Sequence, residues 1–194
     1  MIVNTPRRTD IAGTRERGGT VYIRAVALTL LLIPATVAAK DPAALTAAVA
    51  AGNAAAASDL GVMYQTGRGI AHNDATALKY YVQAAQAGNA IAMSNAGALY
   101  AAGGNGVARD DALAFKYLSQ AAATGNAGAL RAIGYMFQTG RGVSTDPALA
   151  RSYYTRAAAA GDTTALNDLA YLYQNGIGVP RDLAKADQYI AKAA

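Results

Sequence analysis

The stretch from Gly125 to Gly161 reads GNAGALRAIGYMFQTGRGVSTDPALARSYYTRAAAAG, and its pattern decides the fold. Within residues 127–139, apolar and small residues recur at the 3.6-residue spacing of one face of an α-helix. Gly140 fits a left-handed C-cap, Asp146 is placed to cap a second helix, and Pro147 suits the first turn of that helix. The stretch therefore predicts two helices joined by a glycine loop.

The same pattern occurs four times along the chain. Equivalent glycines open successive units at intervals of 36, 37 and 36 residues, and the longer interval comes from one extra residue in the second glycine loop. These opening glycines are Gly52, Gly88, Gly125 and Gly161. One helix pair cannot bury both of its faces, so the units must stack to form a continuous core. We therefore predict an all-α fold, an α-solenoid of about four 36-residue helix pairs.

A glycine stands in the middle of the first helix in three of the units, at Gly61, Gly97 and Gly134, and the fourth unit has Ala170 there. A glycine inside a helix costs about 1 kcal/mol of stability relative to alanine. We interpret its repetition as a sign that the partner helix approaches closely at this point.

These positions resemble the pattern of the Sel-one-like repeat family, which is similar to Ala-x-x-x-Leu-Gly-x-x-Tyr-x-x-Gly-x-Gly-Val-x-x-Asp-x-x-x-Ala-x-x-Tyr-x-x-Ala-Ala-x-x-Gly. The pattern is met most fully at residues 125–161, and the resemblance covers Gly52 to Ala194. Departures are mild: Ala170 replaces the glycine and Asn73 replaces the aspartate. The resemblance implies a tetratricopeptide-like, right-handed superhelix that works as a scaffold or adaptor through protein–protein contact.

Residues 1–39 have the features of a secretory signal peptide, preceded by an unusually long leader at residues 1–20. Arg24 precedes a short apolar run, Pro34 follows it, and small residues lead to Lys40. We predict cleavage after Ala39, a capping helix at residues 40–52 and the repeat array at residues 53–194. The alternative is an uncleaved N-terminal anchor, which would be the chain's only contact with a membrane. Because a secretory signal peptide directs export, we expect the protein to be periplasmic or secreted.

Composition argues against most catalytic chemistry and against cofactors. The chain has no cysteine and a single histidine, His72, and residues 40–194 contain no glutamate. Thiolate metal sites and paired glutamates are therefore excluded, and a single histidine leaves little for a zinc site. We expect no cofactor, no metal and no enzyme activity. The adjacent Asp110 and Asp111 are predicted to face solvent. Basic residues are scattered through residues 40–194, with a net charge of +2, so we predict no nucleic-acid binding.

The first helices of units three and four carry polar and aromatic residues that the predicted core does not use. These residues are Arg131, Tyr135, Gln138, Asn167, Asp168, Tyr171 and Gln174. In this architecture the first helices are expected to line a concave groove. Tyrosine and arginine are common in binding hot spots, so we predict a partner-binding groove here. The alternative is that the two tyrosines stack between neighbouring repeats.

The last unit suggests a second candidate surface. Tyr189 and Ile190 lie on its second helix, and no capping helix follows them in the sequence given. Apolar ends of solenoids can bind a partner or a second copy.

We expect a non-catalytic adaptor of the bacterial cell envelope that binds a protein or an extended peptide. The alternatives are a glycan-binding module, with tyrosine rings stacked on sugars, and a cell-envelope hydrolase, which the absence of glutamate and cysteine disfavours.

Overall fold

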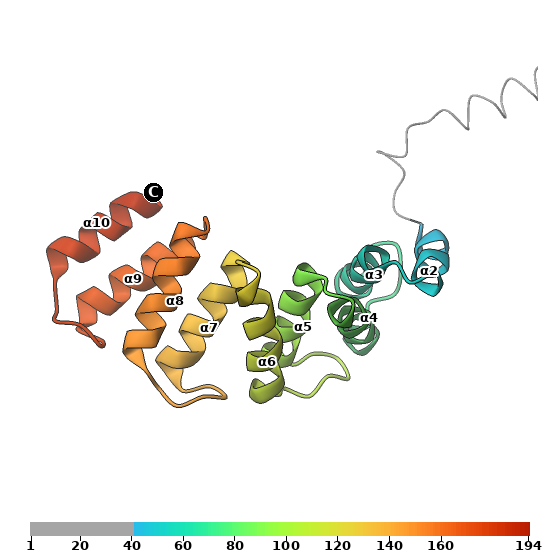
Figure 1. The fold of residues 1–194 in the computed structure, drawn as a ribbon, viewed down its shortest axis with the longest axis horizontal. Coiled ribbons are helices and arrows are strands. Elements are labelled where there is room, and N and C mark those ends of the chain that lie inside the picture. The colour runs from blue at the N-terminus through green and yellow to red at the C-terminus, as the bar shows by residue number, and fades with distance from the viewer. Residues whose placement is uncertain (1–40) are drawn as a thin grey trace, which may run out of the picture. The chain divides into compact units, whose positions relative to one another are not determined.

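The structure, a computed structural model, describes residues 41–194, which contain nine α-helices (Figure 1). A short helix, α2 (Pro42–Ala50), comes first, within the segment predicted to cap the array. Four helix pairs follow: α3 (Ala54–Thr66) with α4 (Asp74–Gln86), α5 (Ala90–Ala102) with α6 (Asp111–Ala123), α7 (Ala127–Thr139) with α8 (Pro147–Ala159), and α9 (Thr164–Asn175) with α10 (Leu183–Ala193). Each helix packs on the next, so the predicted all-α solenoid is confirmed. The predicted signal peptide at residues 1–39 lies outside the described residues.

Side-chain caps fix where the helices begin. Asp146 Oδ1 accepts hydrogen bonds from the backbone N–H groups of Ala148 and Leu149, at 3.0 and 2.9 Å, as the sequence predicted. The first helices of the first three pairs have asparagine caps that were not predicted: Asn126, for example, accepts from the N–H of Ala129 at 2.9 Å. These caps satisfy backbone donors at the helix starts, which no intrahelical bond could do.

The mid-helix glycine lies where the second helix of the same pair touches the first. A Cβ placed on Gly134 would lie 2.8 Å from two ring carbons of Tyr154 and 3.2 Å from the carbonyl oxygen of Ala150. Gly61 has the same relation to the ring of Tyr81, at 2.5 Å. The close approach that the sequence predicted is therefore present.

The glycine loops of the second, third and fourth pairs each contact the pair before. Gly140 ends α7 with φ of 74°, the left-handed conformation that favours glycine. Two residues later, a Cβ on Gly142 would lie 2.5 Å from the backbone carbonyl oxygen of Asp111, at the start of α6. The second glycine of the loop is therefore needed because the loop touches the preceding repeat.

The core runs from pair to pair and is built mainly of alanine, leucine and buried tyrosine. Tyr81 and Tyr154 are at most 1% exposed. Within each pair an aromatic ring of the first helix stacks on a tyrosine of the second, with ring centroids 5.7 Å apart. These stacked pairs are Tyr64 with Tyr80, Tyr100 with Tyr117, Phe137 with Tyr153, and Tyr173 with Tyr189.

Candidate functional site

Tyr135 on α7 and Tyr171 on α9 differ from the other tyrosines of residues 41–194. Their side chains are 48% and 49% exposed, and they are the two tyrosines among the exposed large hydrophobic residues of this part of the chain. The remaining tyrosines of the same region are buried in the core or belong to the stacked pairs described above. Since exposure of a ring this large leaves apolar area in water, these two residues are well placed to contact another molecule.

Arg131 lies one helical turn before Tyr135 and connects α7 to the next repeat. Its Nε donates to Oδ2 of Asp162 at 3.1 Å, and its Nη1 lies 3.6 Å from Oδ2 of Asp168 on α9. Burial raises the pKa of Asp168, and the neighbouring Arg131 acts in the opposite direction. The predicted residues Arg131, Tyr135, Asp168 and Tyr171 therefore belong to one surface, hereafter the α7–α9 surface.

The predicted glutamines and Asn167 have different surroundings. Gln138 Oε1 accepts a hydrogen bond of 2.6 Å from the hydroxyl of buried Tyr154, so its side chain is committed to the fold. Gln174 is half-buried, and its backbone carbonyl oxygen, not its side chain, accepts from Nε of Arg181 at 3.0 Å. Asn167 is exposed on α9. The sequence could not distinguish Gln138 from the exposed residues, because its partner lies 16 residues away.

A pocket of about 310 Å³ opens beside Arg131 and Tyr135. Its apolar walls come from three helices, with Ala101 from α5, Leu118 from α6 and Met136 from α7. Arg141, in the loop after α7, completes the lining. The pocket combines an apolar interior with two guanidinium groups and a phenol, which suits a side chain or a short peptide segment.

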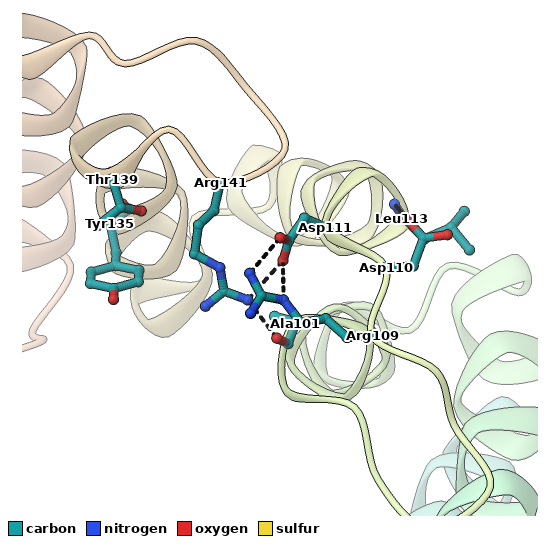
Figure 2. A network of polar contacts seen from close by, with 8 residues as sticks. All are labelled: Ala101, Arg109, Asp110, Asp111, Leu113, Tyr135, Thr139 and Arg141. Atoms are coloured by element: carbon teal, nitrogen blue, oxygen red, sulfur yellow. Dashed lines mark hydrogen bonds and ion pairs between the residues drawn. The ribbon is translucent and has the colours of Figure 1, made fainter.

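The position of Arg141 depends on an ion-pair network that the sequence analysis missed (Figure 2). Its Nη2 donates to the carbonyl oxygen of Ala101 and to Oδ1 of Asp111, at 2.7 Å from the carboxylate. Arg109 donates to the same carboxylate through Nε and Nη2, at 3.1 and 2.6 Å. The network joins the second repeat to the loop of the third and so fixes one wall of the pocket.

Asp110 and Asp111, which were predicted to lie side by side facing solvent, are both half-buried and have different partners. Asp110 accepts from the N–H of Leu113 at 2.9 Å and caps α6. Hydrogen bonds from Arg109 and Arg141 lower the pKa of Asp111 to about 2. Both carboxylates therefore have structural partners, and the pairing with Arg141 was hidden because that residue lies 30 positions away.

At the last helix pair, Ile190 of α10 is 43% exposed. Its counterparts in the other pairs, Tyr81, Leu118 and Tyr154, are at most 3% exposed. Tyr189 is half-buried and stacks on Tyr173. The second predicted surface therefore presents Ile190 far more than Tyr189.

No group of three or more histidine or acidic side chains in residues 41–194 could hold a metal ion. His72 lies with Nε2 at 3.1 Å from Oδ1 of Asp74, whose Oδ2 accepts the N–H of Asn105 at 2.8 Å. This carboxylate therefore links the first two repeats.

Within residues 41–194, none of the helices has the length and apolar character needed to span a membrane.

Comparison with protein families identifies the repeats. A family model described as Sel1 repeat matches residues 54–89, 90–126, 127–162 and 163–194. The chain belongs to the Sel1 repeat family. Sel1 repeats typically form protein-interaction modules, and their fold is generally a non-catalytic scaffold that binds other proteins.

Solved structures of Sel1 repeat proteins have the same fold. A protective antigen of uropathogenic Escherichia coli strains, displaying an SLR fold, is 34% identical with a TM-score of 0.73; the match covers 77% of this chain and 32% of the antigen. A Sel1 repeat protein from Oxalobacter formigenes is 31% identical with a TM-score of 0.70, over 92% of this chain and 68% of that protein.

A more distant structure, cysteine rich protein B of Helicobacter pylori, shares the fold at 20% identity. Its TM-score is 0.51, and the match covers 66% of this chain and 96% of that protein. A search of curated proteins returns no match. This chain thus spans about a third of the length of the E. coli antigen, and the comparisons establish its family rather than a particular partner.

Proposed function

We propose that this Sel1 repeat protein is a non-catalytic adaptor of the bacterial cell envelope, which binds a protein partner through the α7–α9 surface. The observation that carries the proposal is the exposure of Tyr135 and Tyr171, because every other tyrosine described is buried or stacked on an aromatic ring. Exposed tyrosines beside an arginine are typical of the few residues that supply most of the binding energy at protein interfaces.

The surroundings of the two tyrosines support binding to an extended segment of a protein. The pocket of about 310 Å³ beside Tyr135 can accept an apolar side chain, while Arg131 and Arg141 supply N–H donors at its edge. Tyr171 lies on the next first helix, so a segment that crosses from α7 to α9 would contact both rings. The envelope location is proposed from the signal-peptide pattern of residues 1–39.

The alternative with a specific observation in its favour is glycan binding, since an exposed tyrosine ring can also stack on a sugar. A hydrolase is less well supported, because Asp111, Asp162 and Asp168 all have arginine partners. A general acid needs a raised pKa in a site that substrate can reach. The pKa of Asp111 is lowered, and Asp168, whose pKa is raised by burial, is paired with Arg131.

The test is capture from an envelope extract with the immobilised chain, compared with the triple variant R131A/Y135A/Y171A. The matched control is R68A/I91A/L149A, which removes one arginine and two exposed apolar side chains away from this surface. We expect a specific protein to be retained by the wild type and the control and lost from the triple variant. Each hot-spot side chain is expected to contribute about 2 kcal/mol or more.

The same extract, treated with protease before capture, separates the two kinds of partner. A protein partner requires that binding disappears after protease treatment, whereas binding that survives would support a glycan. Equal retention by the wild type and a folded triple variant would contradict the assignment of the α7–α9 surface.

A further inference from the structure

A second pocket, of about 530 Å³, lies between α4 of the first repeat and the glycine loop of the second, and it shares no residue with the α7–α9 surface. Its apolar lining includes Leu78 and Val82 from α4, Tyr100 from α5 and Val107 from the loop. Lys79 and Arg109 also line it, and both are exposed. Asp110 lines it as well, but its Oδ1 accepts the N–H of Leu113 as the cap of α6. It is therefore an apolar pocket with cationic side chains at its edge.

The neighbouring repeat shows what fits this position. Leu78 lies five residues after the N-cap Asn73, and Phe115 lies five residues after the equivalent N-cap Asp110. The ring of Phe115 packs edge-on against Phe137 of the following repeat, with centroids 5.8 Å apart and an interplanar angle of 88°. Phe137 is the counterpart of Tyr100. Between the second and third repeats, the ring of Phe115 therefore packs against Phe137. Between the first and second repeats, the shorter Leu78 leaves the equivalent place beside Tyr100 open.

The third junction has different chemistry at the same position. Arg151 takes the place of Leu78 and Phe115, in a pocket of about 560 Å³ that also contains Tyr173 and Lys185. Hydrogen bonds from Lys185 and Arg151 lower the pKa of Tyr173, and the Lys185 ammonium lies 4.6 Å from the ring centroid. The residue at this position is therefore different at each junction: leucine in the first, phenylalanine in the second and arginine in the third.

We propose that the pocket between α4 and the second glycine loop binds an aromatic side chain of a protein partner, edge-on to Tyr100, as Phe115 packs against Phe137. Lys79 and Arg109 favour an acidic residue next to that aromatic side chain. Arg109 is already paired with Asp111, at 2.6 Å, so Lys79 is the main contact for the carboxylate. This site shares no residue with the α7–α9 surface, and its failure would leave the proposed function standing.

The test is an NMR titration of the ¹⁵N-labelled 194-residue chain with N-acetyl-Phe-Asp-amide, and with N-acetyl-Ala-Asp-amide as the control probe. The backbone amides of Gly106, Val107 and Lys79 should shift with the phenylalanine probe. Binding of the alanine probe should be at least tenfold weaker, because burial of a phenylalanine side chain is worth more than the 1.4 kcal/mol that corresponds to that factor. N-acetyl-Phe-Lys-amide should also bind more weakly. No shift at Gly106 and Val107 with the phenylalanine probe would overturn the proposal.

Two reciprocal variants sharpen the test. Leu78→Phe should fill the pocket and abolish the shifts, while thermal unfolding shows that the chain remains folded. Phe115→Leu should open the equivalent pocket one repeat later and add a second set of shifts at Gly142 and Val143. Unchanged binding of the phenylalanine probe to the folded Leu78→Phe variant would contradict the proposal. The proposal would also be contradicted if the folded Phe115→Leu variant showed no shifts at Gly142 and Val143.

Discussion

Gly134→Ala tests the close packing of α7 on α8, which has counterparts at Gly61 and Gly97 in the first two repeats. The added methyl would lie 2.8 Å from two ring carbons of Tyr154. Tyr154 is 1% exposed, and its hydroxyl donates a hydrogen bond to Gln138, so the ring has little room to move. Overpacking of this kind costs about 1–3 kcal/mol, while alanine inside a helix is favoured over glycine by about 1 kcal/mol. The free energy of unfolding should therefore fall by up to about 2 kcal/mol.

The same helix offers a matched control in Gly128, where the nearest atom to an added Cβ is Oδ1 of Asn126 at 3.6 Å. Gly128→Ala should stabilise the chain by up to about 1 kcal/mol, because it has the benefit of alanine without the contact. The two variants should differ by about 1–3 kcal/mol in urea unfolding followed by circular dichroism at 222 nm. The slopes of the transitions must match the wild type for this comparison to hold. If Gly134→Ala stabilises the chain as much as Gly128→Ala does, the close-packing account is refuted.

Three further perturbations have defined outcomes. Tyr154→Phe removes the hydrogen bond to Gln138 and should lower the free energy of unfolding by about 1 kcal/mol in urea, whereas an unchanged value would mean that the bond contributes nothing. Asp146→Ala removes the cap of α8 and should cost about 1 kcal/mol in thermal unfolding. Asp111 has a pKa of about 2 in the folded chain against an ordinary 3.8, so its contribution is present above pH 4 and is lost as the pH falls toward 2. Asp111→Asn should therefore flatten the fall in Tm between pH 5 and pH 2, and an unchanged slope would contradict the ion-pair network.

The fold was predictable because its decisive signals are local and occur four times. Helix periodicity, the C-cap at Gly140 and the N-cap at Asp146 each involve residues within one turn of one another, and the structure has all three. Gly134 was informative for the same reason: a residue with poor helix propensity, repeated at one position, required a packing explanation. A cap at Asn126 could also have been predicted, since an asparagine or aspartate follows the opening glycine in every repeat.

The site was predictable only in part, because its contacts join residues distant in sequence. The exposure of Tyr135 and Tyr171 followed from helix periodicity, and the structure leaves both exposed. The binding role of these residues stays a prediction. The Asp111–Arg141 pair depends on how one repeat is placed on the next, and no spacing within a repeat determines that placement. Similarly, the pocket at Leu78 becomes visible only when its surroundings are compared with those of Phe115.

The most direct test of the central claim is site-specific photo-crosslinking in envelope extract. A photo-crosslinking amino acid replaces Tyr135, Tyr171 or, as a control away from the α7–α9 surface, exposed Arg68. The account predicts the same protein adduct from the positions of Tyr135 and Tyr171 and none from the position of Arg68. An adduct formed as strongly from the position of Arg68, or no protein adduct from either tyrosine position, would contradict protein binding through this surface.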